Sequence, residues 1–367
     1  MVKLVMSCSR GIRELGEGTL YVGELPEGCK LCLKGGKLVL FITGLCNERC
    51  WYCPVSRLRR KDVIYANNKP VRRFKDVIEE ALLMDAEGTG ITGGEPLLVK
   101  ERLIEFIRAL KRHLGEDHHI HLYTNGLLVT RPLLRELKNA GLDEIRIHPL
   151  STDVLLKIPW ARELGLKAGI EVPVIPGQED FYHKLLMKAE RLKADFVNLN
   201  ELEFSESNCM ALRLRGFSLK PSSQVAVAGS EELALKILEW ARDNTSLNVH
   251  YCAASVKDAV QFKERLKRIA RKVKRPHEEV DEEGLLVKGV IYLDGANPRV
   301  IERILKELKD ELSRGRVLLN VRERRLEFHP SLLESILGLN LSKDIRLGML
   351  REYPDRHLEA EFLPIDL

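Results

Sequence analysis

The sequence predicts an α/β protein built from repeated strand–helix units. Apolar, β-branched runs alternate with amphipathic segments, and the spacing of apolar residues switches from a strand period to a helical period each time. The connections between these segments are short. Parallel strands that alternate with helices form a doubly wound sheet or a whole or partial barrel. The chain has 367 residues, which is long enough for a second domain.

The repeat comprises six strands, of which the first five are each followed by a helix. We expect the strands at 37–43, 89–92, 119–124, 144–149, 168–175 and 196–203. We expect the helices at 72–86, 101–114, 132–140, 154–164 and 180–192. Because a complete barrel of this kind has eight strands, six strands predict a partial barrel.

The flanking regions lack this regular alternation of strands and helices, so we expect the chain to have four parts. These are an N-terminal extension (1–36), the barrel (37–203), a helical extension with a linker (204–284) and a small α+β domain (285–367). The extension should contain a helix at 230–244, a short strand at 247–251 and a long helix at 256–275. That long helix carries nine basic and two acidic residues. A stretch at 316–328 in the last part is expected to form one strand.

The composition indicates a protein with a folded core and without membrane spans. Apolar residues make up 44% and charged residues 31% of the chain, and the net charge is +5. No apolar run is long enough to span a bilayer, and the first residues lack an apolar signal region, so we expect a cytoplasmic protein. Only three glutamines accompany the many Lys, Glu and Arg residues, a bias typical of hyperthermophiles.

The cysteine spacing predicts an iron–sulfur site. Five of the eight cysteines fall between positions 29 and 53, a clustering that favours metal ligation over disulfides. Cys46, Cys50 and Cys53 follow the first predicted strand with C-x3-C-x2-C spacing. A cubane cluster normally takes four cysteines, so three leave one iron open to a small molecule. A structural zinc site is the alternative interpretation of the three thiols alone.

The order of further motifs carries a family resemblance. Gly93-Gly94-Glu95-Pro96 follows the second strand and Thr124-Asn125-Gly126 follows the third. Together with the cysteine triplet, these motifs resemble the radical S-adenosylmethionine (SAM) superfamily over roughly residues 37 to 203. The segment 170–177 (IEVPVIPG) resembles archaeal proteins related to the pyruvate formate-lyase activating enzyme. The resemblance implies a partial (β/α)6 radical SAM barrel.

The resemblance also implies cofactors and residue roles. Cys46, Cys50 and Cys53 would hold a [4Fe-4S] cluster, and SAM would chelate its open iron and be cleaved reductively to a 5′-deoxyadenosyl radical that takes hydrogen from a substrate. Gly93 and Gly94 would let the backbone approach the methionine amine. Further contacts with SAM are expected from Tyr52, Glu95, Thr124 and Asn125.

Polar residues on the later strands are candidates for contacts with SAM or substrate. They are His148, Glu171, Asn198 and Asn200. The alternative is that these side chains are buried and satisfied by hydrogen bonds within the protein. The catalytic residues themselves are left unassigned.

A second metal site is expected at Cys29 and Cys32, whose C-x2-C spacing resembles a metal knuckle. Its remaining ligands could come from Cys8, Cys209 or Cys252, with His250 as an outside option. The site would hold an auxiliary iron–sulfur cluster or zinc, which sequence does not separate. Ordinary buried thiols are the alternative.

The substrate is left open among several functions. Besides a radical SAM enzyme acting on an unidentified substrate, the sequence allows a glycyl-radical-enzyme activase, an RNA- or tRNA-modifying enzyme that uses the basic helix, and a non-catalytic metal-binding protein. Activases usually carry Asp-x-Lys after the fourth strand, where this chain has Ile147-His148-Pro149-Leu150. An electron donor such as ferredoxin or flavodoxin is the expected partner.

Overall fold

The computed structural model describes residues 10–294, 298–339, 345–356 and 358–365. The chain divides into two compact units, one formed by residues 1–82 with 86–262 and the other by residues 83–85 with 263–367. The basic helix α9 (Lys263–Val273) therefore belongs to the C-terminal unit. The expected boundary at residue 285 falls later in the chain than this division.

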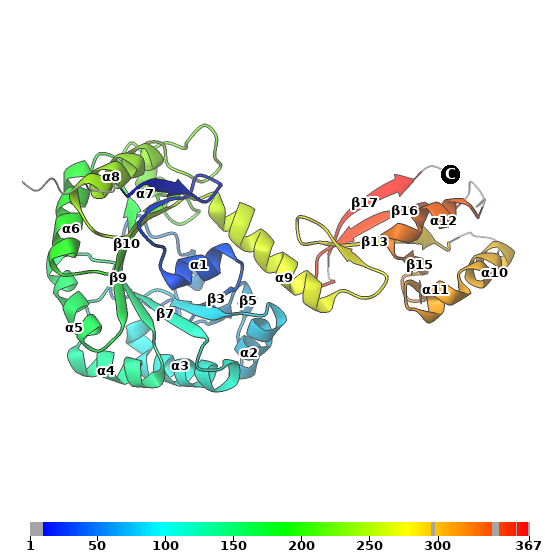
Figure 1. Cartoon of the computed structure of the whole chain (residues 1–367), viewed down its shortest axis with the longest axis horizontal. Helices are drawn as coiled ribbons and strands as arrows, with labels where there is room; N and C mark the ends of the chain where they lie inside the picture. The colour runs from blue at the N-terminus through cyan, green and yellow to red at the C-terminus, as the bar shows by residue number, and fades with distance from the viewer. Residues whose placement is uncertain (1–9, 295–297, 340–344, 357, 366–367) are drawn as a thin grey trace, which may run out of the picture. The chain divides into compact units, whose positions relative to one another are not determined.

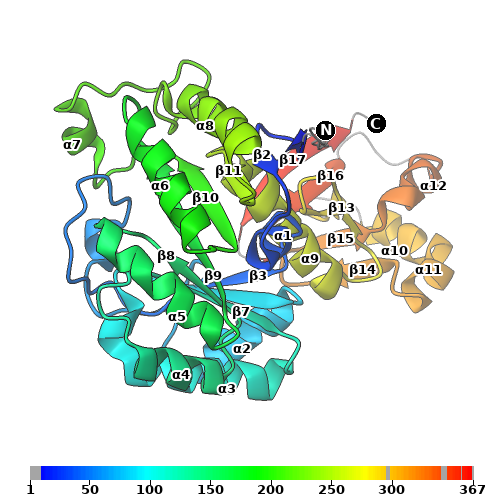
Figure 2. The same ribbon diagram turned by 60° about the vertical axis from the view of Figure 1, so that its left-hand side comes forward.

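The first unit is an open parallel barrel with helices on its outer face (Figures 1 and 2). Its sheet has eleven strands in the order β1-β2-β11-β10-β9-β8-β7-β6-β3-β4-β5. The six strands of the repeat are β3 (Lys37–Phe41), β6 (Gly88–Thr92), β7 (His119–Thr124), β8 (Glu144–Ile147), β9 (Lys167–Val174) and β10 (Phe196–Glu201). The helices between them are α2 (Phe74–Leu83), α3 (Lys100–Leu114), α4 (Arg131–Ala140), α5 (Lys157–Glu163) and α6 (Glu179–Arg191). The expected partial barrel is confirmed.

A seventh parallel strand, β11 (Val249–Cys252), extends the sheet beside β10. The region 204–284 is therefore not only helical, because it supplies this strand together with α7 (Cys209–Arg213) and α8 (Ser230–Asn244). A π-helical segment, η4 (Lys257–Phe262), runs directly into α9, so the long helix expected at 256–275 is continuous over 256–273 but π-helical in its first part. Short antiparallel pairs cover both edges of the sheet: β1 (Ile12–Glu14) with β2 (Leu20–Val22), and β4 (Tyr65–Ala66) with β5 (Lys69–Pro70).

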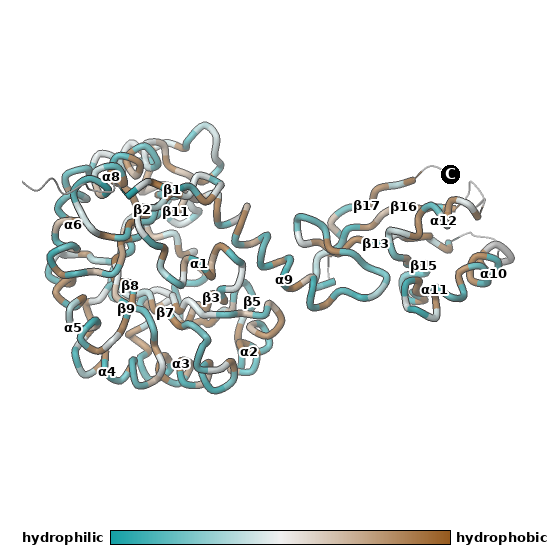
Figure 3. The backbone as a smooth tube through the Cα atoms, viewed as in Figure 1, coloured by the Kyte–Doolittle hydropathy of each residue, from teal (hydrophilic) through white to brown (hydrophobic). Residues whose placement is uncertain are grey.

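The strands sort apolar and polar side chains onto opposite faces of the sheet, because side chains alternate along a strand. In β7, Ile120 and Leu122 are fully buried apolar residues, whereas the alternate positions carry His119, His121 and Tyr123. Along the helices, hydrophilic and hydrophobic stretches alternate (Figure 3). Polar residues therefore line the inside of the barrel.

The N-terminal extension contributes a helix to the inner side of the barrel. This helix, α1 (Glu27–Leu33), contacts β3, β6 and β7 and lies inside the curve of the sheet in Figure 1. A Cβ atom at Gly28 would lie 2.6 Å from atoms of both His121 and Arg146. Glycine at this position therefore lets α1 approach the polar interior closely.

The second unit contains a mixed α/β arrangement with an antiparallel sheet, in agreement with the expected α+β class. The sheet order is β14-β15-β13-β16-β17, with β12 paired to β13. The strands are β12 (Glu279–Val280), β13 (Leu286–Tyr292), β14 (Val317–Asn320), β15 (Arg325–Phe328), β16 (Leu347–Glu352) and β17 (Glu359–Ile365). The helices are α10 (Pro298–Glu307), α11 (Lys309–Ser313) and α12 (Leu333–Leu337). The single strand expected at 316–328 is wrong, since a turn at 321–324 divides it into the antiparallel pair β14 and β15.

Candidate functional site

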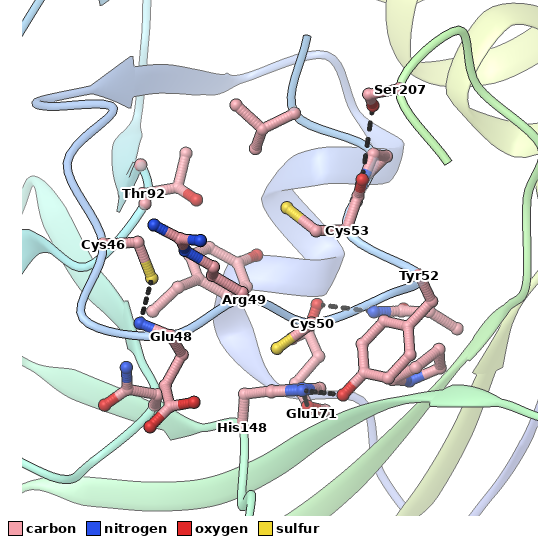
Figure 4. A pocket seen from close by; sticks show the side chains of 18 of the residues that line it. Cys46, Glu48, Arg49, Cys50, Tyr52, Cys53, Thr92, His148, Glu171 and Ser207 are labelled. Carbon is pink, nitrogen blue, oxygen red and sulfur yellow. Dashed lines mark hydrogen bonds between the residues drawn. The ribbon is translucent and has the colours of Figure 1, made fainter. Parts of the chain in front are cut away.

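A cavity of about 920 Å³ opens at the carboxyl ends of the barrel strands. Its wall includes the cysteine loop after β3, the Gly93-Gly94 turn after β6 and polar residues from β7 to β10. All three cysteines of the triplet line it, and Figure 4 shows their side chains in the same pocket as Tyr52, His148 and Glu171. The structure thus brings together residues that lie more than a hundred positions apart in the chain.

The cysteine loop presents its thiols to the cavity. Cys46 is exposed, whereas Cys50 and Cys53 are half-buried. The backbone N–H of Glu48 donates to Cys46 Sγ at 3.4 Å, as Figure 4 shows. Burial raises the pKa of Cys46 and Cys50, and the neighbouring thiols raise it further. Three thiols that lie in one loop and line one cavity fit a shared metal cluster.

The two glycines of the Gly-Gly-Glu turn make room for the cysteine loop. A Cβ atom at Gly93 would lie 2.3 Å from the carbonyl oxygen of Thr43, and one at Gly94 would lie 2.2 Å from that of Leu45. The N–H of Gly94 donates to the Thr43 oxygen at 2.8 Å. Close backbone packing between these two loops is therefore one physical reason for the glycines. The expected approach of the turn to the methionine amine stays a prediction.

Glu95 ties the turn to the next strand. Its side chain is fully buried and is not part of the cavity wall. Oε1 accepts from Leu97 N at 3.0 Å and from Thr124 Oγ1 at 2.8 Å, and Oε2 accepts from Asn125 N at 2.7 Å. Burial raises the pKa of Glu95 although these three donors oppose the rise. In this arrangement Glu95 positions Thr124 and Asn125, both of which line the cavity.

A hydrogen-bonded chain runs from Tyr52 into the barrel. His148 Nδ1 lies 3.0 Å from the carbonyl oxygen of Glu171, so this nitrogen must carry the proton. Burial lowers the pKa of His148, which leaves Nε2 as an acceptor for the Tyr52 hydroxyl at 2.8 Å. These hydrogen bonds hold the ring of Tyr52, which belongs to the cysteine loop, on the cavity wall (Figure 4).

The Glu171 carboxylate is held in its charged form by three hydrogen-bond donors. Oε2 accepts from Arg146 Nη1 and from Asn198 Nδ2, each at 3.0 Å, and Oε1 accepts from Asn200 Nδ2 at 3.0 Å. Burial alone would raise the pKa of Glu171, but Arg146 and the two amides outweigh it and lower the pKa. All the candidates from the later strands thus lie in one polar network.

Sequence reasoning missed two residues of this site. Arg146 is 2% exposed and lies at the centre of the network, where it also contacts Tyr123. The sequence pattern that could have identified Arg146 is the alternation of charged and apolar residues along the buried strand β8.

The second residue is Asn208, which is 1% exposed. Its Nδ2 donates to the carbonyl oxygens of Tyr52 at 3.0 Å and Glu203 at 2.9 Å. No local pattern marks its contact with the cysteine loop, because Tyr52 lies 156 positions away in the sequence.

The second expected metal site, at Cys29 and Cys32, stays a prediction. Cys29 and Cys32 are buried on α1, and Cys29 Sγ accepts from Arg146 and Asn198 at 3.4 Å each. Cys252 lies near both thiols, and burial first and these neighbours second raise its pKa to about 12. Among the residues that the structure describes, neither these cysteines nor Cys46, Cys50 and Cys53 bring three ligand atoms within 4.8 Å of one another, the spacing expected around a single ion. Cys209 lies on α7 with Sγ directed to Glu206, and Cys8 falls outside the described residues.

Comparison with known proteins places the chain in a family. A model of the radical SAM superfamily matches residues 40–162. A protein of Methanocaldococcus jannaschii named "Putative glycyl-radical enzyme activating enzyme" is 40% identical over 86% of this chain and 84% of its own length. The chain belongs to the radical SAM superfamily. It is also 34% identical to a GTP 3′,8-cyclase of Alkaliphilus oremlandii, over 29% of this chain and 32% of that protein.

The chain also gives a partial match to a solved structure. This chain is similar to SuiB of Streptococcus suis, with 14% sequence identity and a TM-score of 0.44. The match covers 65% of this chain and 59% of SuiB. The radical SAM enzyme described here uses a [4Fe-4S] cluster and SAM as cofactors. The donor set fits this pair, because the three thiols of one loop line a cavity of about 920 Å³ that also has room for a small molecule. In the described part of the chain, no helix is both long and apolar enough to cross a membrane.

Proposed function

We propose that this enzyme cleaves SAM reductively and abstracts a hydrogen atom from a substrate bound in the barrel cavity. The observation that supports this most is the convergence of Cys46, Cys50 and Cys53 with the polar network of Glu171 in one cavity. When bound, the reduced cluster and SAM supply a 5′-deoxyadenosyl radical. The cavity volume of about 920 Å³ is at the upper end for ligand sites, which leaves space for a substrate beside SAM.

The residues of the chain would bind and orient the two ligands. Cys46, Cys50 and Cys53 would hold the cluster, and the loop that carries them is fixed by Asn208 through the Tyr52 carbonyl. The Tyr52 ring offers an aromatic face to SAM, and its hydroxyl is held by His148. The charged Glu171 carboxylate would accept hydrogen bonds from hydroxyl or amino groups of a substrate.

Product analysis with matched cysteine variants tests this function. The full chain, reconstituted with iron and sulfide under anaerobic conditions and reduced with dithionite, should convert SAM to 5′-deoxyadenosine. Cys50→Ala should abolish the product, because the cluster loses a thiolate. Cys209→Ala is the control, since Cys209 lies outside the cavity wall and should retain activity. Equal activity of the two variants would overturn the proposal.

A glycyl-radical enzyme as substrate is the second candidate. The relative from M. jannaschii carries a name of this kind and aligns with most of this chain. The absence of Asp-x-Lys at 147–150 opposes it. The activity would appear as a glycyl radical in the electron paramagnetic resonance spectrum of a partner enzyme incubated with this chain, SAM and reductant. Absence of this signal with every glycyl-radical enzyme of the source organism would exclude this candidate.

Nucleic acid has less support as a substrate. Basic residues of the α9 region form ion pairs, such as Lys263 with Glu283 at 2.9 Å and Lys267 with Glu264 at 2.8 Å. Charge reversal of Lys263, Lys267 and Arg271 should abolish salt-dependent RNA binding if RNA is the substrate. An acidic low-potential protein, ferredoxin or flavodoxin, remains the proposed electron donor in the cytoplasm.

A further inference from the structure

A cluster of two histidines and one glutamate lies at the amino ends of the barrel strands, the end opposite the cavity. His119 and His121 are on β7 and Glu144 is on β8. One nitrogen or oxygen atom from each lies within 4.8 Å of those from the other two. We propose that these three side chains bind one zinc ion, separate from the iron–sulfur cluster.

The backbone places the three ligands on one face of the sheet. His119 and His121 are two residues apart on one strand and so project to the same side. His121 pairs in register with Glu144 on the neighbouring parallel strand. The two histidine rings lie 5.5 Å apart between centroids, and His119 Nε2 is 3.7 Å from Glu144 Oε2. A small inward movement would bring the ligand atoms to the distances of about 2.0–2.2 Å from zinc that imidazole and carboxylate adopt.

His121 indicates that a ligand belongs here. It is fully buried, and within the described ranges neither of its ring nitrogens has a hydrogen-bond partner. The ring lies between two glycines: a Cβ atom at either Gly28 or Gly90 would come within 2.6 Å of it. The chain therefore reserves space for an imidazole whose polar atoms it leaves unsatisfied. A buried polar group without a partner destabilises the fold, and an ion bound between His121, His119 and Glu144 would supply that partner.

The protonation states suit a metal better than a proton. Burial lowers the pKa of both His119 and His121, so both rings are neutral and each has a lone pair to donate. Glu144 Oε1 is occupied by Arg146 Nε at 2.6 Å. Oε2 is the oxygen that faces His119, so the carboxylate is held by Arg146 on one side and open on the other.

Charges of both signs surround the cluster. Arg146 and Lys37 act on His121 and oppose a cation. On the side of His119, which is 13% exposed, the carboxylates of Glu144, Asp143 and Glu27 favour one. An ion would therefore enter past His119 and rest between the rings and Glu144. Two imidazoles and a carboxylate suit zinc, with water as the fourth ligand.

Zinc and iron counted separately in the purified, reconstituted chain test the proposal. The wild type should retain about one zinc per chain after desalting, in addition to its iron. Glu144→Gln and His121→Ala should each lower the zinc content by about tenfold or more. His250→Ala is the matched control: His250 is also a buried histidine whose ring nitrogens lack partners in the described structure, but it lies on β11 outside the cluster.

A second readout separates this site from the cysteine loop. Cobalt added to cluster-free Cys50→Ala protein should give visible absorption bands that Glu144→Gln removes. If His121→Ala does not fold, as judged by circular dichroism, the near-isosteric Glu144→Gln decides. Absence of zinc from the wild type, or zinc that survives Glu144→Gln and disappears in Cys50→Ala, would overturn the proposal. The outcome does not depend on SAM cleavage, so the two proposals fail separately.

Discussion

Replacement of Glu95 by glutamine should loosen the loop that follows β7. The carboxylate accepts three hydrogen bonds, from Leu97 N, Thr124 Oγ1 and Asn125 N. A glutamine side chain has one oxygen, so its NH2 group must face one of the two backbone N–H groups. The Thr124 hydroxyl can rotate to accept, but a backbone N–H cannot. One buried N–H therefore loses its acceptor in either amide orientation.

The magnitude follows from two opposing effects. An orphaned buried donor costs about 1–3 kcal/mol of unfolding free energy. Because burial raises the pKa of Glu95, a neutral side chain recovers part of the desolvation cost. We therefore expect the free energy of unfolding to fall by about 1–2 kcal/mol. For a unit of this size, each kcal/mol lowers Tm by about 2–4 °C.

Thermal unfolding followed by circular dichroism measures this loss in the cluster-free chain. SAM affinity of the reconstituted enzyme should fall in the same variant, because Asn125 lines the cavity. Glu101→Gln is the control, since Glu101 has a 77% exposed side chain and its replacement should change stability by less than about 0.5 kcal/mol. A Glu95→Gln protein with wild-type Tm and wild-type SAM affinity would refute the positioning role.

Three further changes probe the supports of the cysteine loop. Arg102 lowers the pKa of Asp62 to about 2, below the unfolded value of about 3.9. Asp62 therefore stabilises the fold above about pH 4, and this contribution is lost as the pH falls towards 2. The difference in unfolding free energy between wild type and Asp62→Asn should shrink over that range, and a constant difference would contradict this. Asn208→Ala should lower the free energy of unfolding by about 1–3 kcal/mol, measured by denaturant titration, because the Tyr52 carbonyl loses its donor. Iron analysis should show less iron retained, and an unchanged iron content would argue that Asn208 does not hold the cysteine loop. Gly94→Ala should displace the loop, because its Cβ would lie 2.2 Å from the Leu45 oxygen, and a wild-type cluster spectrum would count against the close packing.

The barrel was predictable because its signals are local. The strand predicted at 119–124 and the helix predicted at 230–244 have the same bounds in the structure, since strong periodicity marks both. Elements that depend on distant partners were not predictable. β2 is three residues long and gains its place by pairing with β11 over two hundred positions away. The turn at 321–324 between β14 and β15 was overlooked because it lacks glycine and proline.

The candidate site was predictable to the extent that motifs carry it. The cysteine triplet, the Gly-Gly-Glu turn and Thr124-Asn125 follow successive strands, so the topology brings them to one edge of the sheet. Roles that depend on three-dimensional contacts could not be read from sequence. Glu95 is buried between loops, and Arg146 reaches Glu171 only because β8 and β9 are neighbours.

The central claim is that three cysteines hold a [4Fe-4S] cluster whose fourth iron is open to SAM. Electron paramagnetic resonance of the dithionite-reduced full chain, recorded with and without SAM, tests this most directly. The account predicts a reduced-cluster signal whose g-values and line shape change when SAM is added. A signal that SAM leaves unchanged, or no cluster signal in a fully reconstituted and folded chain, would contradict it.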